Sequence, residues 1–333
     1  MLPGRSTGMK IKRVENMFGR RQFLRLCSVA AVGSEGGIGS ASGPRFQIGI
    51  TTNTRNGGDW NKDMLLSFRE ASEVGFHNVE TFFNYVKPWW EKPQDLKRQM
   101  DQMNLHFVTV SNGGPMKMQF EDPAQSQQLI DEHVRLGQWI KKWFACDHLK
   151  SNTGSRRSEG TTREDLAQMS KSMNEIGKRL ADSGVKFGVH AHLWTQFQTR
   201  SEVDAVMELT NPKYVYLVLD TGHITMAGMD PVELTKAYVS RIVEFHLKDT
   251  RPEDRGGHKG PTPQREGYTD IGKRIFFELG KGGGVDFPGI LAVLKKNNWN
   301  GWLTVELDST DTTPKDSAST SKRYVEEALH LKV

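Results

Sequence analysis

Short runs of β-forming apolar residues alternate with longer stretches of helical periodicity from residue 46 onward. Eight such runs predict strands at 46–52, 77–82, 105–111, 146–151, 185–192, 214–220, 242–249 and 302–307. The clearest amphipathic stretches between them predict helices at 60–74, 94–104, 124–143, 162–183 and 286–297. Repeated strand–helix units predict an α/β protein with a parallel sheet. Eight units over about 290 residues predict a (β/α)8 TIM barrel.

Glycines mark several of the predicted boundaries. Gly75, Gly184 and Gly301 each stand between a helical stretch and the next strand, where a residue with positive φ ends a helix. A doubly wound sheet is the alternative, but it rarely needs eight units, and TTNTRNGGDW at 51–60 is not a glycine-rich phosphate loop. Because no linker divides residues 45–333, we expect a single catalytic barrel there.

The front of the chain carries its excess of positive charge. Residues 1–45 contain eight Lys or Arg and two acids, whereas the rest contains 37 basic and 38 acidic residues. A near-neutral body lacks the positive surface that nucleic-acid binding requires, so DNA and RNA are not expected partners. The segment 1–44 resembles a twin-arginine export signal, with Arg20 and Arg21 ahead of Phe23 and Leu24. We therefore predict a disordered leader and an exported, periplasmic barrel, or a cytoplasmic one if the leader is only a basic extension.

Polar residues recur at the C-terminal ends of the predicted strands. They are Glu80, Asn112, Lys150, His190, His192, Asp220, His223, His246, Lys248, Asp249 and Glu306. Barrel active sites form at this end of the strands, so these side chains are expected to converge. Two imidazoles and two carboxylates come from four consecutive strands: His190, Asp220, His246 and Glu306. Such a mixed nitrogen and oxygen donor set suits one divalent metal ion.

Five sequence blocks carry a resemblance to a known family. They are GVHAH at 188–192, LDTGH at 219–223, FHLKD at 245–249, GKGGGVDF at 280–287 and GWLTVEL at 301–307. In these blocks the chain resembles the xylose-isomerase-like barrel superfamily, and most closely its branch of 2-keto-myo-inositol dehydratase and related sugar isomerases and epimerases. The resemblance implies one Mn²⁺ or Co²⁺ ion, with Zn²⁺, Mg²⁺ or Fe²⁺ as alternatives, on Asp220, His246 and Glu306.

The first metal ligand of that family is usually a glutamate, and this chain has a histidine there. The dehydratase branch also carries histidines at this point, which favours that branch. Strand alternation points His190 and His192 the same way, so the sequence does not decide which one binds metal.

A divalent ion at such a site can polarise a ketone and stabilise the enediolate that forms when a neighbouring proton leaves. Candidate acids and bases are Glu80 and Lys150 on one side and His192 and Lys248 on the other. The alternatives are a structural ion pair between Glu80 and Lys150, and a solvated rim formed by Lys248 and Asp249.

Substrate contacts are expected from Asn112, His223, Trp194 and Arg251, although His223 could instead orient a metal ligand. Aromatic residues also follow the second strand, at Phe82, Phe83, Tyr85, Trp89 and Trp90, where they suit a sugar face or ordinary loop packing. The long polar segment 249–284 is predicted to be a binding loop or lid over the barrel mouth.

The enediolate has two fates, and each gives a different function. Loss of a β-oxygen substituent makes the protein a metal-dependent lyase or dehydratase of a keto-sugar, keto-glycoside or keto-cyclitol, and an exported protein favours a 3-keto glycoside. Reprotonation makes it a sugar isomerase or epimerase. A sugar-binding barrel without catalysis is a further alternative. No membrane contact is expected of the mature protein, and a homo-oligomer is possible.

Overall fold

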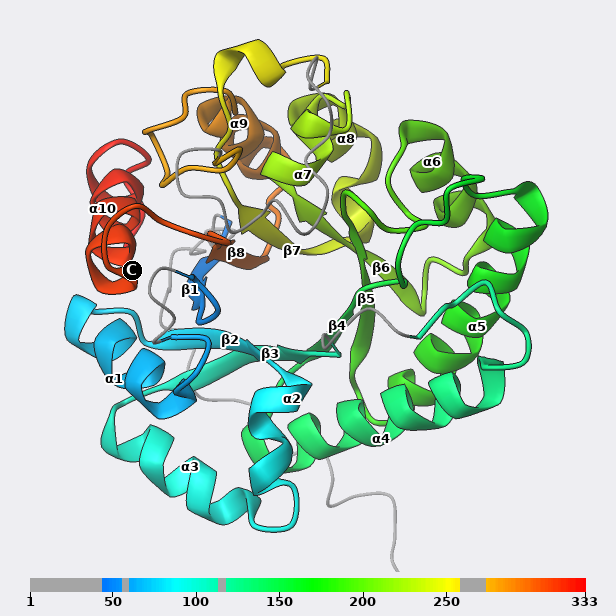
Figure 1. Ribbon diagram of the computed structural model, residues 1–333, viewed down its shortest axis with the longest axis horizontal. Coiled ribbons are helices and arrows are strands. Elements are labelled where there is room, and N and C mark those ends of the chain that lie inside the picture. Colours follow the sequence, from blue (N-terminus) through cyan, green and yellow to red (C-terminus); the bar gives the residue numbers. More distant parts are fainter. Residues whose placement is uncertain (1–43, 56–59, 113–117, 258–273) are drawn as a thin grey trace, which may run out of the picture. The chain divides into compact units, whose positions relative to one another are not determined.

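Eight parallel strands form a barrel surrounded by helices in the computed structural model, which describes residues 44–55, 60–112, 118–257 and 274–333 (Figure 1). The strands are β1 (Phe46–Thr51), β2 (Asn78–Phe82), β3 (His106–Ser111), β4 (His148–Ser151), β5 (Lys186–Ala191), β6 (Val215–Asp220), β7 (Ile242–Leu247) and β8 (Gly301–Val305). Their hydrogen-bonded order is β3-β2-β1-β8-β7-β6-β5-β4, and every pair is parallel. The predicted (β/α)8 TIM barrel is therefore confirmed.

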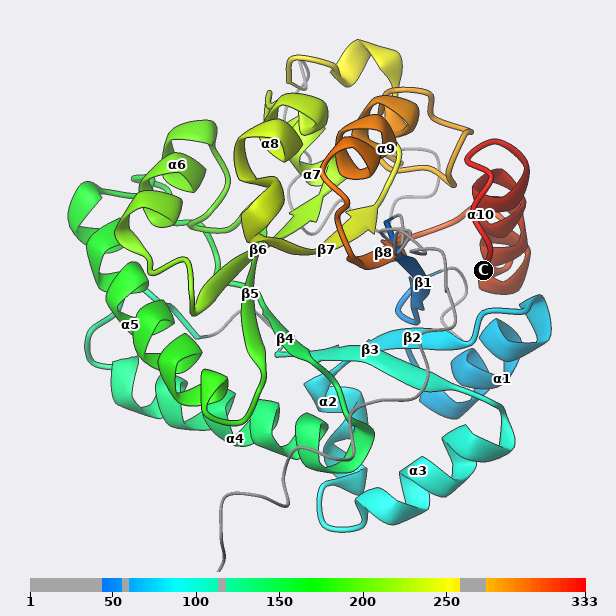
Figure 2. The ribbon, with the colours of Figure 1, turned by 180° about the vertical axis from the view of Figure 1, so that it is seen from behind.

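Helices lie on the outside of the strands, as both ribbon views show (Figures 1 and 2). The α-helices are α1 (Met64–Val74), α2 (Phe83–Val86), α3 (Pro93–Gln102), α4 (Ser126–Phe144), α5 (Arg163–Ala181), α6 (Arg200–Leu209), α7 (Thr221–Met226), α8 (Pro231–Tyr238), α9 (Phe287–Lys296) and α10 (Pro314–Glu327). Short 3₁₀ helices are η1 (Lys87–Trp89), η2 (Val239–Arg241) and η3 (Pro252–Asp254). The five helices predicted from periodicity are present with shifts of a few residues at their ends.

Gly75 and Gly301, two of the glycines predicted to end helices, have different roles in the structure. Gly75 ends α1 with φ of 102°, and its N–H donates to the carbonyls of Ala71 and Ser72, as a left-handed C-cap does. Gly301 does not end a helix, so that prediction is wrong. It begins β8, where an added Cβ would lie 2.5 Å from the ring of Trp299, and Asn298 takes the positive φ after α9.

Strands β3 and β4 are not joined by the backbone hydrogen-bond ladder that joins the other neighbouring strands. In the part of the chain that the structure describes, these two strands are the ends of the hydrogen-bonded order. Thr109 Oγ1 donates to the carbonyl of His148 at 2.9 Å, and the N–H of Asn112 donates to the carbonyl of Lys150 at 3.2 Å. The barrel is thus nearly closed, with a side chain and a loop amide holding the last joint.

The barrel interior contains a buried polar network next to its apolar core. Glu244 accepts hydrogen bonds from His148 Nε2 at 2.9 Å and from Thr304 Oγ1, and all three side chains are buried. Burial disfavours the charged imidazole, but the bonds to Asp147 and Glu244 outweigh it and raise the pKa of His148 to about 9. A protonated imidazole, hydrogen-bonded to Glu244, therefore lies inside the barrel below its mouth.

Two predicted segments lie wholly or partly outside the described residues. The predicted export signal and leader at 1–44 lies outside the described residues except for residue 44, and of the predicted loop at 249–284 the part at 258–273 lies outside them. None of the helices in the described ranges is both long enough and apolar enough to cross a membrane.

Candidate metal centre

Four predicted side chains meet where β5, β6, β7 and β8 end. One donor atom from each of His190, Asp220, His246 and Glu306 lies within 4.8 Å of the others. Asp220 Oδ2 is 3.6 Å from His190 Nε2 and 3.9 Å from His246 Nδ1, and His246 Nδ1 also contacts Glu306 Oε2. All four side chains are buried. The strands deliver them to one point because each lies within one residue of the end of its strand.

None of the four facing atoms makes a hydrogen bond of normal geometry in the described structure, although Lys248 Nζ lies 3.2 Å from Asp220 Oδ2 and 3.5 Å from Glu306 Oε2. The four atoms are His190 Nε2, Asp220 Oδ2, His246 Nδ1 and Glu306 Oε2. Buried polar atoms are normally paired, because an unpaired one costs about 1–3 kcal/mol. Two imidazole nitrogens and two carboxylate oxygens form a donor set that suits Mn²⁺, Co²⁺, Fe²⁺ or Zn²⁺. The residues present therefore fit one divalent cation.

Each imidazole makes a hydrogen bond on the side away from the centre, and this bond determines which ring nitrogen faces the centre. His246 Nε2 lies 2.8 Å from Glu80 Oε2, and His190 Nδ1 lies 2.8 Å from Asn152 Oδ1. Because a carboxylate and an amide oxygen only accept, each ring must donate there. The remaining nitrogens, Nδ1 of His246 and Nε2 of His190, then face the centre, as in metal-binding histidines. Without a cation, Glu306 outweighs burial and raises the pKa of His246 to about 10, so a bound cation would replace the proton on its Nδ1.

His190 and His192 have different surroundings, although both point into the barrel mouth. The ring of His192 lies 3.4 Å from the ring of His223, measured between centroids, and 5.1 Å from that of His190. Its Nδ1 faces the carbonyl of Leu193 at 2.5 Å. The geometry thus puts His190 in the four-residue cluster and His192 beside it.

Glu80 and Lys150 form an ion pair of 2.9 Å, and both side chains are 1% exposed. Burial would raise the pKa of Glu80, but Lys150 and His246 lower it to about 2. Burial likewise opposes the charge of Lys150, and Glu80 outweighs it and raises the lysine pKa. Because both Glu80 oxygens are engaged, this carboxylate links Lys150 to the far side of a candidate metal ligand.

Lys248 lies within the site and is fully buried. Its Nζ is 2.9 Å from Asp308 Oδ2, 3.0 Å from His223 Nε2 and 3.2 Å from Asp220 Oδ2. Burial opposes its charge, but Asp220 and Asp308 outweigh it and raise the pKa of this lysine. The interpretation of Lys248 and Asp249 as a solvated rim is therefore wrong.

Asp249 is also buried, and it holds the segment that returns over the site. Its carboxylate accepts the N–H groups of Gly280, Gly283 and Val285. Phe276, from the same segment, packs 4.5 Å from the ring of His223 and 4.8 Å from Lys248 Nζ. Residues 274–285 therefore cover one side of the centre with an aromatic ring.

The remaining predicted substrate contacts differ in placement. The ring of Trp194 lies 5.9 Å from that of His192, and its backbone has φ of 65°, which a tryptophan adopts at an energetic cost. Asn112 does not contact the four-residue cluster itself. Its Oδ1 accepts the N–H of Asn152, whose side chain contacts His190. The guanidinium of Arg251 instead donates to the carbonyl of Arg274 and lies over Phe277.

Sequence reasoning missed four residues of this region: Asn152, Asp308, Glu244 and His133. The first three stand two positions from Lys150, Glu306 and His246. Strand alternation could therefore have indicated that each lies on the same side of the barrel wall as that neighbour. His133 lies on α4, where it accepts from Asn112, and no local pattern marks it.

Comparison with known families agrees with this architecture. The sequence model of the family described as xylose isomerase-like TIM barrel matches residues 68–331. The chain belongs to this family. Members of the xylose isomerase-like family among curated proteins include a relative named inosose dehydratase from Mesomycoplasma hyopneumoniae strain J, 32% identical over 277 residues, which are 81% of this chain and 89% of that one.

A second relative named inosose dehydratase, from Clostridium botulinum, is 34% identical over 170 residues. That match covers 50% of this chain and 56% of the relative, so the chain spans about half the length of this relative.

Two solved structures have the same fold. A sugar phosphate isomerase/epimerase from Parabacteroides distasonis has a TM-score of 0.65 at 16% identity, with 88% of this chain and 97% of that chain covered. The IOLI protein, whose crystal structure contains a bound zinc atom, has a TM-score of 0.63 at 15% identity, with 85% and 97% covered. At these identities the likeness concerns the fold alone.

Proposed function

We propose that this protein is a metal-dependent dehydratase or lyase that acts on a cyclic polyhydroxy ketone, such as a keto-sugar, keto-glycoside or keto-cyclitol. The observation that carries the proposal is the cluster of four buried donor atoms on His190, Asp220, His246 and Glu306, which lie within 4.8 Å of one another. The relatives named inosose dehydratase support the class of substrate, since an inosose is a keto-cyclitol. The zinc bound by the IOLI protein supports a divalent ion.

A divalent ion on these four residues supplies a Lewis acid, which draws electron density from a substrate ketone and makes the neighbouring C–H bond more acidic. Mn²⁺, Co²⁺ or Zn²⁺ fits the donor set. Burial of the four ligands keeps water away and strengthens the electrostatic interaction with the ketone.

His192 is the proposed base for that C–H bond. Burial and the nearby Lys248 lower the pKa of its imidazole to about 3, so the ring is neutral at physiological pH but a weaker base than a free imidazole, and the proton it takes must be strongly acidified by the ketone. Its Nδ1–H points at the carbonyl of Leu193, which leaves the lone pair of Nε2 available. The ring centroid of His192 lies 5.1 Å from that of His190, a candidate metal ligand. This ring is therefore placed to take the proton from the carbon next to the ketone.

The proposed acid is a buried ammonium group, either Lys150 or Lys248. Both lysines are charged, since their acidic neighbours raise their pKa values. Each holds three N–H donors and can pass one proton to a departing oxygen. The reaction is balanced: the C–H electrons form a carbon–carbon double bond, the β C–O bond breaks, and the oxygen leaves as water or an alcohol.

The test is turnover of purified, Mn²⁺-loaded protein on 2-keto-myo-inositol and on methyl 3-keto-β-glucoside, followed by enone absorbance. Formation of an enone with release of water or methanol is the expected result. In D₂O, deuterium incorporation without loss of a group would show an isomerase or epimerase instead. Binding of the ketones without either change would show a sugar-binding barrel. The variant Asp220→Asn is the matched control, because it keeps the size of the side chain and removes its charge.

A further inference from the structure

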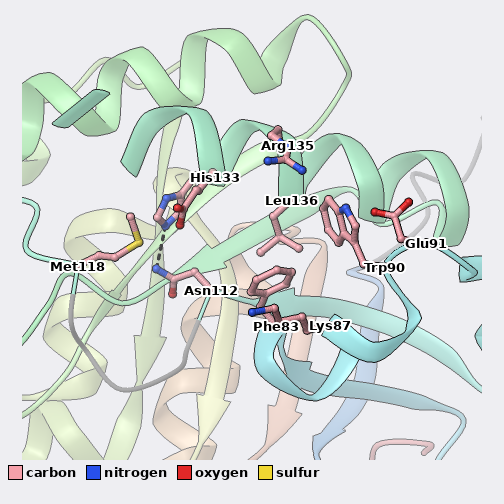
Figure 3. A pocket seen from close by; sticks show the side chains of 10 residues that line it. Phe83, Lys87, Trp90, Glu91, Asn112, Met118, His133, Arg135 and Leu136 are labelled. Atoms are coloured by element: carbon pink, nitrogen blue, oxygen red, sulfur yellow. Dashed lines mark hydrogen bonds between the residues drawn. The ribbon is translucent and has the colours of Figure 1, made fainter. Parts of the chain in front are cut away.

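An aromatic cavity of about 550 Å³ lies between α2 and α4. It is lined in part by Phe83, Trp90, Asn112, His133 and Leu136. Asn112 and His133 bond to each other at one end of the cavity, and Trp90 lies toward the other end (Figure 3). The side chain of Asn112 therefore borders this cavity rather than the four-residue cluster at the candidate metal centre.

The amide group of Asn112 bonds to the backbone of Asn152 through both of its heavy atoms. Asn112 Oδ1 accepts the N–H of Asn152 at 2.9 Å, and Nδ2 donates to the carbonyl of Asn152 at 3.2 Å. The backbone N–H of Asn112 also donates to the carbonyl of Lys150 at 3.2 Å. Because β3 ends at Ser111 and β4 at Ser151, these bonds join the two strand ends at the place where no backbone ladder joins them.

His133 holds the same amide group from the side of the cavity. His133 Nδ1 lies 2.7 Å from the carbonyl of Leu129, which only accepts, so Nδ1 carries the ring proton and Nε2 is an acceptor. Asn112 Nδ2 donates to this Nε2 at 2.8 Å. Burial lowers the pKa of His133 to about 4, so the ring keeps this form at neutral pH. The Nδ2 group of Asn112 therefore has two acceptors, and its oxygen is left for the N–H of Asn152.

Asn152 connects this joint with a candidate metal ligand. Its Oδ1 lies 2.8 Å from His190 Nδ1, which must donate because an amide oxygen only accepts. This bond turns His190 Nε2 toward the centre. The ladder between β4 and β5 ends at Ser151, so the backbone of Asn152 lies beyond it. The position of the acceptor of His190 thus depends on the two bonds from the side chain of Asn112.

We infer that Asn112 is a positioning residue of the candidate metal centre, because its side chain holds Asn152 where Asn152 orients the imidazole of His190. The inference rests on the proposed function, since it concerns the ion of that reaction. The alternative is the direct substrate contact that the sequence predicts for Asn112. The two roles have different consequences: loss of a positioning residue weakens metal binding, whereas loss of a substrate contact raises KM and leaves metal binding unchanged.

The first test is the metal affinity of Asn112→Leu, which keeps the approximate size of the side chain and removes both of its bonds to Asn152. Competition with a fluorescent chelator is expected to show a loss of about 10–100-fold, as for other groups that orient metal ligands. The visible absorption of the Co²⁺-loaded variant, which depends on the ligands around the ion, is expected to differ from that of wild type. The bond from the backbone of Asn112 to Lys150 remains, so the strand ends stay connected.

Asn174→Leu is the matched control, because Asn174 makes the same pair of bonds elsewhere, on α5. Its Oδ1 accepts the N–H of Asn211 at 2.7 Å, and its Nδ2 donates to the carbonyl of Leu209 at 3.1 Å. This variant is expected to bind metal like wild type. Asn112→Asp is a milder second variant, since it keeps the acceptor for the N–H of Asn152 and loses the donated bonds.

The second test is a double-mutant cycle with Asn152→Ala, which removes the acceptor of His190 and keeps the backbone that Asn112 holds. Asn152→Ala alone is expected to weaken metal binding by about 10–100-fold. In this background Asn112→Leu is expected to change metal affinity by less than about twofold, because both changes act through the same bond to His190. Its effect on the urea midpoint of unfolding is expected to persist, because the joint between β3 and β4 loses the same bonds.

Two results would overturn the inference. Unchanged metal affinity in Asn112→Leu, with a raised KM for the keto-sugar, would assign a substrate contact instead. Equal losses of metal affinity from Asn112→Leu in the presence and absence of Asn152→Ala would show that the residue acts on the barrel as a whole. In either case a metal-binding wild type leaves the proposed function intact, whereas a wild type that binds no divalent ion contradicts the proposed function itself.

Discussion

His246 Nε2 donates a 2.8 Å hydrogen bond to Glu80 Oε2, and so the opposite nitrogen of this ring faces the candidate metal centre. Glu80→Gln removes the charge that favours this ring orientation and leaves the buried ammonium of Lys150 without its partner. We expect metal affinity to fall by about 10–100-fold, as it does when such outer carboxylates are lost. Competition with a fluorescent chelator measures it. Glu73→Gln, on the surface, is expected to bind metal like wild type.

Asp220→Asn is expected to abolish metal binding without unfolding the protein. Asp220 also caps α7, since its Oδ1 accepts the N–H of His223, and asparagine caps a helix equally well. Wild type with metal at 100 times its Kd should gain about 2.7 kcal/mol of stability over the metal-free form. Urea unfolding with and without Mn²⁺ measures this difference. A variant that gains as much as wild type would contradict the assignment of Asp220.

Substitutions of the two neighbouring histidines, His190 and His192, should affect metal binding and proton transfer separately. His190→Gln is expected to lose bound metal, since Nε2 of His190 faces the centre. His192→Gln should keep the metal and lose about 10²–10⁴-fold in kcat, the usual range for a general base. Metal analysis of both purified variants, together with initial rates, tests the pair. If His192→Gln lost metal and His190→Gln kept it, the two roles would be reversed.

Stability should fall above neutral pH because of His148. Its pKa is 6.5 in the unfolded chain and about 9 in the folded protein, so its contribution is complete below pH 6.5 and disappears as the pH rises through 9. The shift corresponds to about 3 kcal/mol. Urea unfolding at several pH values from 6 to 10 should show this loss in wild type and a flatter profile in His148→Gln. Parallel profiles would falsify the assignment.

Much of the fold and site could be predicted because barrels place chemistry at strand ends. The alternation of apolar runs and helical stretches defined all eight strands, and the polar residue ending each run marked the mouth. Alternation could not separate His190 from His192, since both point inward. Their different environments follow from a rise of about 6.6 Å over two residues, which carries His192 past the end of β5.

The supporting contacts could not be predicted because they join distant parts of the chain. Glu80 and His246 are 166 residues apart, and Asn112 reaches His133 on a helix. The aromatic residues after β2 were ambiguous for the same reason. Only the packing of Trp90 on Trp139 shows that they form the wall of a cavity.

The open joint between β3 and β4 leaves each of these two strands with a backbone ladder on one side only, and β4 is one of them. Strand β4 is the shortest described strand but carries Lys150, and Asn152 follows it directly. Sideways displacement of β4 would move the ammonium group of Lys150 and change the orientation of His190 together, without disturbing the six joints that do not involve β4. The least constrained edge of the scaffold is thus the one that reaches both the aromatic cavity and the candidate ligand sphere.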